Sequence, residues 1–422
     1  MSGRWAREGG RLHRGGVVLV AAVILSACGT EPAEEGIAGE ALPEILSGEV
    51  RFLDPPAAPN SLGPDLVAAD GRLLMSWLEP EEKGDGRSHR LLVSRLVEDG
   101  WTPPVVVAEG DDFFANWADF PAVVEAGDGS LLAHWLAKTS DEIYAYSIFL
   151  ARSEDGGATW RQLGRLNDDQ TPTEHGFVSY VAEGDGVRAF WLDGREMADG
   201  KPMTLRTALI GDTAGPGEML DERVCECCAT SAALTPSGPV VVYRDRLEDE
   251  VRDIAVVRRA GGGWTAPREV AVDGWLIPGC PVNGPAIATA GDRAAVAWFT
   301  VADERPRVQV AFSDNAGETW SQPVVVDEAG PFGRVDVVSA ADGGFWVVWL
   351  ARAEDRAAIR LQRWSSEGHS GPPRVVAQTD GGRSSGFPRL LRLEDRLYLA
   401  WVDVTAESPR RLRLAAIEIP SV

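Results

Sequence analysis

An aromatic residue recurs along most of the chain, each time inside a short apolar run typical of a β-strand. Successive copies are 51 to 58 residues apart, which is the period of a four-stranded blade in a β-propeller. The same stretch has no helical periodicity over ten or more residues, so we expect an all-β fold. The seven aromatic residues are Trp77, Trp135, Trp191, Tyr243, Trp298, Trp349 and Trp401.

Each aromatic residue belongs to a repeat with the same succession of runs. In the second repeat a first run covers 121–124, the aromatic run covers 131–136 and a third run covers 147–151. Gly and Asp residues mark the turns between runs, as expected for antiparallel hairpins. Seven repeats predict seven four-stranded antiparallel blades. The repeats begin near Asp65, Pro121, Phe177, Thr230, Pro285, Val335 and Pro388.

The last repeat has only three runs, the third of which ends at 417–419, whereas an unassigned run at 49–53 precedes the first repeat. We expect this N-terminal run to complete the last blade and close the ring. Closure of this kind pairs strand edges that would otherwise promote aggregation. The propeller is therefore expected to form a single domain over 48–422.

The N-terminus has the pattern of an export signal. Four arginines precede an apolar run at 17–25, which is too short to span a bilayer. The tetrapeptide Leu-Ser-Ala-Cys at 25–28 resembles the lipobox of bacterial lipoproteins. The resemblance implies that 1–27 is a signal peptide, that Cys28 is acylated, and that the lipid attaches the protein to a membrane. A plain secretory signal with a chance cysteine is the alternative.

Residues 28–47 are rich in Glu, Ala, Gly and Pro and are expected to form an acidic tether, because they cannot bury enough apolar surface to fold. Gly29 follows the cysteine in place of the Asp associated with inner-membrane retention. The lipoprotein resemblance therefore implies a place in the bacterial cell envelope, on the outer membrane, either periplasmic or surface-exposed.

The net charge of -23 limits the partners of the chain. An acidic surface repels phosphate backbones, so nucleic acid is not expected to bind. Only three of the cationic residues are Lys, so Arg is the main cationic side chain. Arg can form bidentate hydrogen bonds with carboxylates. We expect a monomer that binds a small molecule, a glycan or a metal ion.

One segment matches the pattern S-x-D-x-G-x-T-W, and a second repeats it with Asn315 in the Asp position. Here the chain resembles the sialidase superfamily, whose Asp-boxes, or BNR repeats, have this pattern. In such a motif a short polar side chain caps backbone N–H groups, Gly supplies positive φ and Trp packs against the sheet. The resemblance implies a structural hairpin between the third and fourth strands, on the face opposite a sialidase active site. The motif residues are Ser153, Asp155, Gly157, Thr159 and Trp160, then Ser313, Asn315, Gly317, Thr319 and Trp320.

The same resemblance implies an Arg triad, a Tyr nucleophile paired with Glu, and an Asp acid/base. The sequence departs from this pattern. The early F/Y-R-I-P signature is missing, and all five Tyr lie in predicted strands. Sialidases have six blades, which makes six the alternative to seven here. Activity as an exo-α-sialidase or related glycoside hydrolase is therefore an alternative function.

In a propeller the loop leading into each first strand and the end of each second strand reach the same face. The loops that lead into first strands, called lead-in loops below, contribute His175, four cysteines, Asn283 and Arg334. The ends of second strands contribute charged residues that can bind an anion or substrate or take part in catalysis. Alternatively, these residues form solvated ion pairs with one another and bind no ligand. These strand-end residues are Asp193, Arg195, Arg244, Asp245, Arg246, Arg352 and Asp403.

The four cysteines lie in the lead-in loops of repeats four and five, which are expected to be neighbours. Thiolates select soft metals such as Cu(I) and Zn, and His175 could add an imidazole ligand. Two disulfides are the alternative, because an exported chain meets an oxidising compartment. The adjacency of two of the cysteines disfavours a bond between them and favours the metal slightly. The cysteines are Cys225, Cys227, Cys228 and Cys280.

His175 could alternatively act as a general base or be a satisfied loop side chain, and His134 is expected in the core. The sequence contains no Walker loop, H-E-x-x-H motif or dinucleotide fingerprint. We therefore expect a lipid-anchored, sialidase-like propeller that binds a soft metal ion or a small anionic or glycan ligand. The alternatives are a glycoside hydrolase and a scaffold for protein interactions outside the cytoplasm.

Overall fold

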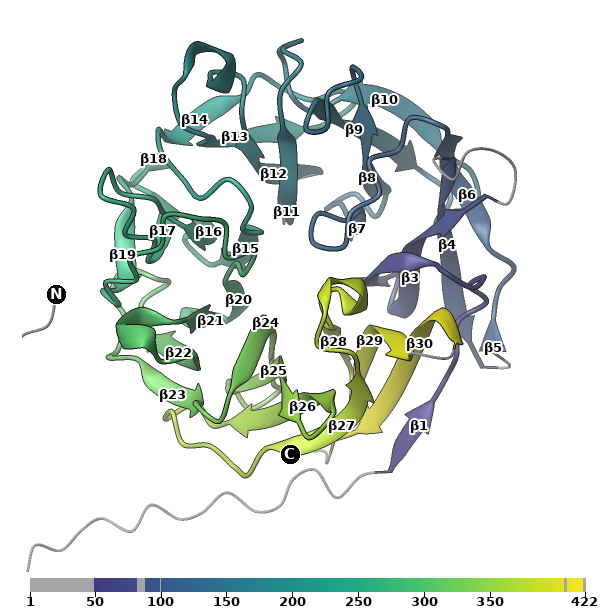
Figure 1. Cartoon of the computed structure of the whole chain (residues 1–422). Helices are drawn as coiled ribbons and strands as arrows, with labels where there is room; N and C mark the ends of the chain where they lie inside the picture. The colour runs from purple at the N-terminus through teal and green to yellow at the C-terminus, as the bar shows by residue number, and fades with distance from the viewer. Residues whose placement is uncertain (1–48, 82–87, 99, 406–407, 420–422) are drawn as a thin grey trace, which may run out of the picture. The chain divides into compact units, whose positions relative to one another are not determined.

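The computed structural model describes residues 49–81, 88–98, 100–405 and 408–419. Within them, regular structure consists of strands and three single-turn 3-10 helices, η1 (Met197–Asp199), η2 (Ala302–Glu304) and η3 (Arg383–Ser385). The strands form seven antiparallel sheets around a central axis (Figure 1). The predicted all-β propeller of seven blades is confirmed, and the six-bladed alternative is wrong.

The first four blades follow one another along the chain, each running from the axis outwards. Blade 1 contains β2 (Leu62–Ala69), β3 (Arg72–Pro80), β4 (His89–Val97), β5 (Gly100–Trp101) and β6 (Val105–Gly110). Blade 2 contains β7 (Ala122–Glu125), β8 (Leu131–Lys138), β9 (Tyr146–Ser153) and β10 (Arg161–Arg165). Blade 3 contains β11 (His175–Glu183), β12 (Gly186–Asp193), β13 (Thr204–Ile210) and β14 (Glu218–Asp221). Blade 4 contains β15 (Ser231–Thr235), β16 (Gly238–Arg244), β17 (Ile254–Ala260), β18 (Gly263–Trp264) and β19 (Arg268–Ala271).

The remaining blades have the same plan. Blade 5 contains β20 (Ala286–Ala290), β21 (Arg293–Thr300), β22 (Arg307–Ser313) and β23 (Val324–Asp327). Blade 6 contains β24 (Pro331–Ser339), β25 (Phe345–Ala353), β26 (Arg356–Trp364) and β27 (Arg374–Thr379). Blade 7 contains β28 (Arg389–Leu393), β29 (Arg396–Thr405), β30 (Ser408–Glu418) and the N-terminal β1 (Val50–Phe52).

The N-terminal strand closes the ring as the sequence predicted. β1 pairs antiparallel with β30, with Val50 opposite Ile417 and Phe52 opposite Ala415. The ring of Phe52 lies edge-on to that of Trp401, with 6.1 Å between ring centroids. The two ends of the chain therefore share blade 7, which leaves β1 as the outer strand of that sheet.

The core lies between neighbouring blades, and the recurring aromatic residues fill it. All seven are in second strands and are almost fully buried. Several of the indole N–H groups donate to a carboxylate at the blade edge: Trp191 to Asp193 at 2.8 Å and Trp349 to Asp327 at 2.7 Å. The period of the aromatic residues in the sequence thus reflects one structural requirement, a large apolar side chain between neighbouring sheets.

The two Asp-boxes form the hairpins expected of them, between the third and fourth strands of blades 2 and 5. In the first, Asp155 Oδ1 accepts from Thr159 N at 2.9 Å and from Ser153 Oγ at 2.8 Å. Asn315 Oδ1 accepts the equivalent two bonds at 2.9 Å in the second. Gly157 and Gly317 have φ of 92° and 77°, a region that favours glycine. The boxes are structural turns.

No helix among the described residues is long and apolar enough to cross a membrane. The predicted signal peptide, Cys28 and the tether lie outside the described residues. Their assignment therefore stays a prediction from the sequence.

Candidate functional site

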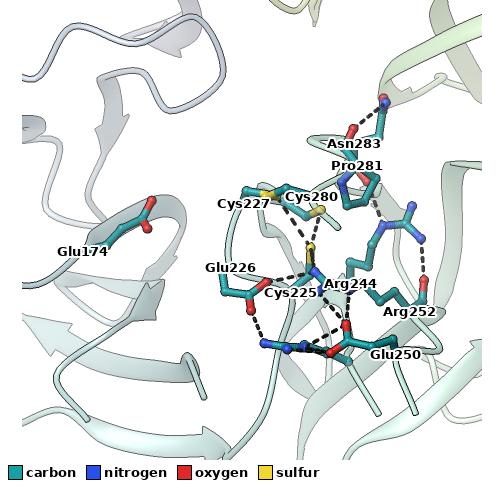
Figure 2. Close-up of a disulfide and its surroundings, with 12 residues drawn as sticks. Glu174, Cys225, Glu226, Cys227, Arg244, Glu250, Arg252, Cys280, Pro281 and Asn283 are labelled. Carbon is teal, nitrogen blue, oxygen red and sulfur yellow. Dashed lines mark hydrogen bonds and ion pairs between the residues drawn. A yellow bond between two sulfur atoms is a disulfide. The ribbon is translucent and has the colours of Figure 1, made fainter. Parts of the chain in front are cut away.

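The lead-in loops of blades 4 and 5 lie side by side, as the repeat assignment predicted. Cys227 and Cys280, which are 53 residues apart in sequence, form a disulfide between the two loops (Figure 2). The loops also pack tightly below this bond, because a Cβ on Gly284 would lie 2.0 Å from the carbonyl oxygen of Ala229. All four cysteines of the two loops therefore belong to one site.

The remaining two cysteines are thiols, and they lie directly beside the disulfide. Cys225 Sγ is 2.7 Å from Cys228 Sγ and 4.0 Å from Cys227 Sγ. The ligand atoms of these three residues all lie within 4.8 Å of one another, close enough to hold one metal ion. The sequence prediction of a shared cysteine cluster agrees with this geometry, which is compatible with both metal binding and disulfide formation.

The backbone of the blade 4 loop fixes the position of Cys225. Val224 forms a bridge with Asp245, and Cys225 N donates to Arg244 O at 3.0 Å. In the other loop Val282 has a φ of 50°, a strained conformation for a β-branched residue. Strain of this kind two residues from Cys280 is typical of a functional loop held in place by its surroundings.

Two arginines and two glutamates surround the thiols (Figure 2). Arg252 Nη1 donates to Cys225 Sγ at 3.4 Å and to Glu226 at 2.9 Å. Glu250 accepts from Arg246 at 2.6 Å and from Arg252 at 2.8 Å. Hydrogen bonds from both guanidinium groups lower the pKa of Glu250 to about 2, so Glu250 is a carboxylate at neutral pH.

This environment changes the chemistry of Cys225. Burial alone would raise the pKa of its thiol, but hydrogen bonds from Cys228 and from Cys227 N, together with the charges of Arg244 and Arg252, bring it down to about 7. Burial raises the pKa of Cys228 well above its usual value. Cys225 is therefore the more acidic thiol of the pair, and a thiolate is the form that binds metals and attacks disulfides.

Arg244 is placed differently from the sequence prediction of an anion-binding residue. It is 1% exposed and donates to three carbonyl oxygens, those of Asn283 at 3.0 Å, Arg252 at 2.7 Å and Phe299 at 2.7 Å. Its guanidinium also lies over the ring of Trp275, 4.8 Å from the centroid. Each of its three nitrogens donates to a carbonyl inside the protein and the side chain is buried, so Arg244 joins blades 4 and 5 and offers no exposed face to a ligand.

Asp245 and Arg246 line a surface cleft of about 610 Å³ between blades 3 and 4, together with Lys201, Asp221 and Glu248. Burial, and then repulsion from Asp221, raise the pKa of Asp245 to about 6. Arg246 is paired with Glu226 and Glu250. Because the cleft contains acidic as well as basic residues and Arg246 is already neutralised, its charge does not favour an anion.

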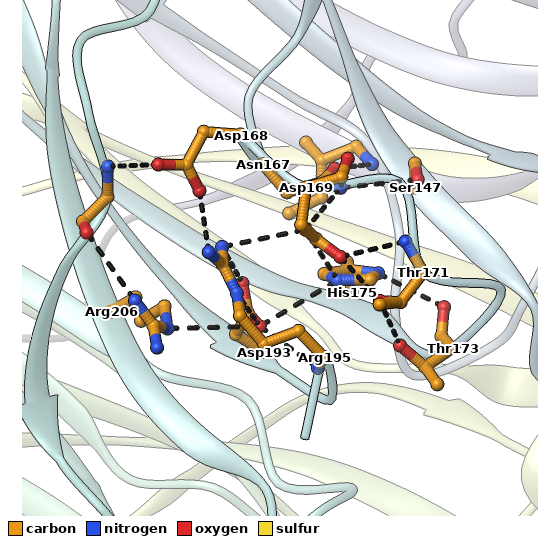
Figure 3. A network of polar contacts seen from close by, with 12 residues as sticks. Ser147, Asn167, Asp168, Asp169, Thr171, Thr173, His175, Asp193, Arg195 and Arg206 are labelled. Carbon is orange, nitrogen blue, oxygen red and sulfur yellow. Dashed lines mark hydrogen bonds and ion pairs between the residues drawn. The ribbon is translucent and has the colours of Figure 1, made fainter. Parts of the chain in front are cut away.

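The sequence suggested that His175 could add an imidazole ligand to the cysteine site. In the structure its ring is held instead by a separate group of polar residues (Figure 3). Nδ1 lies 3.0 Å from Thr173 O, and Nε2 lies 3.1 Å from Asp169 Oδ1 and 3.7 Å from Asp193 Oδ1. Burial by itself lowers the pKa of His175, but the hydrogen bond to Asp169 and the charge of Asp193 raise it overall. His175 is therefore a buried imidazole whose surrounding carboxylates favour its protonated form.

Asp193 and Arg195 belong to this same network. Arg195 Nε donates to Asp193 Oδ1 at 2.7 Å, and Arg195 Nη1 lies 2.7 Å from Asp168. Asp169, His175 and Asp193 have ligand atoms close enough to hold a metal ion. Their carboxylates are, however, already occupied by the Arg195 guanidinium and the His175 ring, so this group is a polar network, which is expected to stabilise blade 3.

The other predicted site residues lie elsewhere on the ring. Arg352 in blade 6 is exposed and lies over the ring of Phe332, and Asp403 in blade 7 is paired with Arg356 at 3.3 Å. Arg334 is buried and donates to Ser385 Oγ at 2.7 Å. None of these contacts connects them to the cysteines, so the predicted residues do not form a single site.

One group of polar residues was missed by the sequence analysis. Tyr146 OH donates to Glu174 Oε1 at 2.6 Å and lies 3.2 Å from Asp119 Oδ2. Burial raises the pKa of Asp119 to about 8. Burial, with repulsion from Glu226, raises that of Glu174 to about 7. Tyr146 is fully buried, whereas Glu174 is half-buried and points towards the open side of the cysteine site (Figure 2).

No protein-family model and no curated protein matches the sequence. A solved structure from Dyadobacter fermentans, described as a protein of unknown function, has a TM-score of 0.52 at 15% identity and covers 88% of this chain and 99% of its own. An ulvan lyase of polysaccharide lyase family PL25, bound to a GlcA(1-4)Rha3S saccharide, has a TM-score of 0.56 at 12% identity, covering 87% and 96%. The Hadza microbial sialidase Hz136 has a TM-score of 0.50 at 14% identity, covering 78% and 73%.

Structural matches at sequence identities this low show a shared fold and do not assign a function, because one fold serves many functions. The chain therefore has a distant structural similarity to sialidase and polysaccharide-lyase β-propellers, and its function must be argued from its own residues.

Proposed function

We propose that this protein binds a soft metal ion, Cu(I) or Zn²⁺, through the thiolates of Cys225, Cys227, Cys228 and Cys280 when all four are reduced. We further propose that it does so as a monomer in the bacterial cell envelope, anchored by a lipid on Cys28. The observation that carries the proposal is the convergence of four sulfur atoms from the lead-in loops of two neighbouring blades.

The donor set fits these ions. Zn–S bonds of about 2.3 Å in a tetrahedral site place the sulfurs about 3.8 Å apart. Cys225 Sγ lies 4.0 Å from Cys227 Sγ, whereas Cys228 Sγ, 2.7 Å from Cys225 Sγ, would have to move away to reach this separation. Cu(I) also prefers thiolates. Because thiolate ligation leaves negative charge at the site, the positive charges of Arg244 and Arg252 beside Cys225 favour the bound state.

Titration of the reduced, metal-free protein with Cu(I) and Zn²⁺ tests the proposal. We expect about one ion per chain, and a loss of at least about tenfold in affinity for Cys225→Ser and for Cys228→Ser, because each removes one thiolate. Asp169→Asn is the matched control, since it alters the other group with metal-ligand geometry and should leave binding unchanged. Failure of the reduced protein to bind either ion would contradict the proposal.

A second function is favoured by one observation, the half-buried Glu174 with a pKa near 7 at the same face. A carboxyl group of this kind suits general acid catalysis of glycoside cleavage. Turnover of a fluorogenic sialoside, abolished by Glu174→Gln and kept by Glu196→Gln on the neighbouring surface, would support this function. No turnover, with metal binding intact, would exclude a sialidase and leave the metal site as the function.

A further inference from the structure

The disulfide and the thiol pair of the cysteine site differ in exposure. Cys280 is exposed and Cys227 is half-buried, whereas Cys225 and Cys228 are 0% and 1% exposed. The disulfide therefore lies on the solvent side, with the two thiols behind it. Small thiols, disulfides and metal ions in solution meet the outer pair first.

Cys225 is in contact with both partners that an exchange reaction would need. Its sulfur is 4.0 Å from Cys227 Sγ of the disulfide and 2.7 Å from Cys228 Sγ. Arg252 Nη1 donates to the same sulfur at 3.4 Å and holds it in place. Thiol–disulfide exchange proceeds by attack of a thiolate on a disulfide sulfur. Cys225 is the thiol of the buried pair that contacts both Cys228 and the disulfide sulfur of Cys227.

We propose that the four cysteines share one disulfide that moves between the exposed pair, Cys227 and Cys280, and the buried pair, Cys225 and Cys228. This exchange goes beyond metal binding, because it takes place in the metal-free protein with two thiols and one disulfide. It makes the site a thiol–disulfide exchange centre as well as a metal site.

The reaction has two steps and needs no external oxidant or reductant. The Cys225 thiolate attacks Cys227 Sγ, the Cys227–Cys280 bond breaks, and Cys280 leaves as a thiolate. The Cys228 thiolate then attacks Cys225 Sγ, the Cys225–Cys227 bond breaks, and Cys227 leaves as a thiolate. The buried dithiol is oxidised, the exposed disulfide is reduced, and the two protons of the buried thiols pass to Cys227 and Cys280.

The exchange gives the exposed pair a chemical role. After the exchange, Cys227 and Cys280 are a surface dithiol, which can attack a disulfide of a small molecule or of an unfolded protein. The disulfide itself is now the buried Cys225–Cys228 bond. Reductants from solution reach that buried bond poorly. The substrate class of the exposed pair is therefore a soluble disulfide or its thiol.

Peptide mapping measures the position of the disulfide. The full chain carrying Cys28→Ser is fully reduced, freed of metal and reoxidised with one equivalent of diamide. It is then quenched with acid and labelled with a maleimide in denaturant. Trypsin places three of the cysteines in peptide 224–244 and Cys280 in peptide 269–293. A Cys227–Cys280 bond joins these peptides, whereas a Cys225–Cys228 bond leaves them separate, with Cys280 labelled.

We expect the wild-type cysteine set to yield both the joined pair and separate peptides with labelled Cys280. Cys225→Ser removes the attacking thiolate and should reduce Cys280 labelling at least about tenfold. Cys228→Ser is the matched control, because Cys225 can still attack Cys227 and release Cys280, so labelling should persist. Permanently joined peptides in the wild-type set, or equal Cys280 labelling in Cys225→Ser, would overturn the proposal.

Failure of the disulfide-exchange proposal can be distinguished from failure of the metal-binding proposal. The mapping is done without metal, and the titration is done on the four-thiol form, so either result can fail while the other holds. Each of the two proposals is thus decided by its own measurement.

Discussion

Arg244 Nη2 donates to the carbonyl oxygen of Phe299 at 2.7 Å, a bond that links the second strand of blade 4 to that of blade 5. Two further carbonyl groups, of Asn283 and Arg252, accept hydrogen bonds from the other two nitrogens of the same guanidinium. A buried side chain with this many partners stabilises the ring at the position where the cysteine loops begin.

Replacing Arg244 with Met should therefore destabilise the fold strongly. Three buried carbonyl groups lose their donor, and we expect the free energy of unfolding to fall by about 3 kcal/mol or more. Arg246→Met removes only surface ion pairs and should cost less than about 1 kcal/mol. Urea unfolding of the two variants measures the difference. Equal small effects would mean that Arg244 is not structural.

The Asp-box of blade 2 gives a prediction with a control inside the chain. Asp155→Ala removes the acceptor of Thr159 N and Ser153 Oγ, so the melting temperature should fall. Asp155→Asn should keep it close to wild type, because Asn315 makes the equivalent bonds in blade 5. Thermal melts of the two variants distinguish the role of hydrogen bonding from that of charge, and equal losses would assign the effect to charge.

Asp119 predicts a dependence of stability on pH. Burial raises its pKa from 3.8 to about 8 in the folded protein, so between these values the folded state binds more protons than the unfolded state. The free energy of unfolding contributed by this group therefore falls as pH rises through the window.

Asp119→Asn mimics the protonated carboxyl group beside Tyr146 and Glu174 and should flatten this part of the pH profile. The exposed Asp141→Asn is the control and should keep the wild-type slope. Urea unfolding at several pH values measures both. An Asp119→Asn profile parallel to that of wild type would contradict burial as the cause.

Ring closure by β1 predicts that removal of 49–54 lowers the melting temperature of the whole propeller in a single transition. The deletion exposes the edge of β30 and removes the contact of Phe52 with Trp401. Shortening the tether by the same number of residues should have no such effect. Equal melting temperatures for the two deletions would show that β1 contributes nothing to closure.

Much of the fold could be predicted from the sequence because one physical requirement is repeated. Each blade needs a large apolar residue in its second strand, and the spacing of Trp77, Trp135 and the later aromatic residues follows from it. The same spacing assigns Cys227 and Cys280 to lead-in loops of adjacent blades, so their proximity could be predicted although 53 residues separate them.

The errors concern the directions of side chains. Arg244 lies two and four residues after Val242 and Val240, which pack between blades 4 and 5. Alternate residues of a strand point to the same side, so this alternation already indicated a buried Arg244. His175 had no comparable signal, because its partner Asp169 lies in a loop whose conformation the sequence pattern does not fix.

The group of Asp119, Tyr146 and Glu174 was missed for a related reason. Its members come from three separate segments of blades 2 and 3, and no motif connects them. Their raised pKa values arise mainly from burial, which is a property of the packed structure. Only the folded chain brings the three side chains together.

The most direct test of the metal site is the metal content of the reduced chain, measured together with its free thiols. Our account predicts about one Cu(I) or Zn²⁺ per chain, with Cys225, Cys227, Cys228 and Cys280 protected from thiol reagents until a chelator removes the ion. Four reactive thiols and no bound metal after loading would contradict the account, and the cysteines would then serve disulfide chemistry alone.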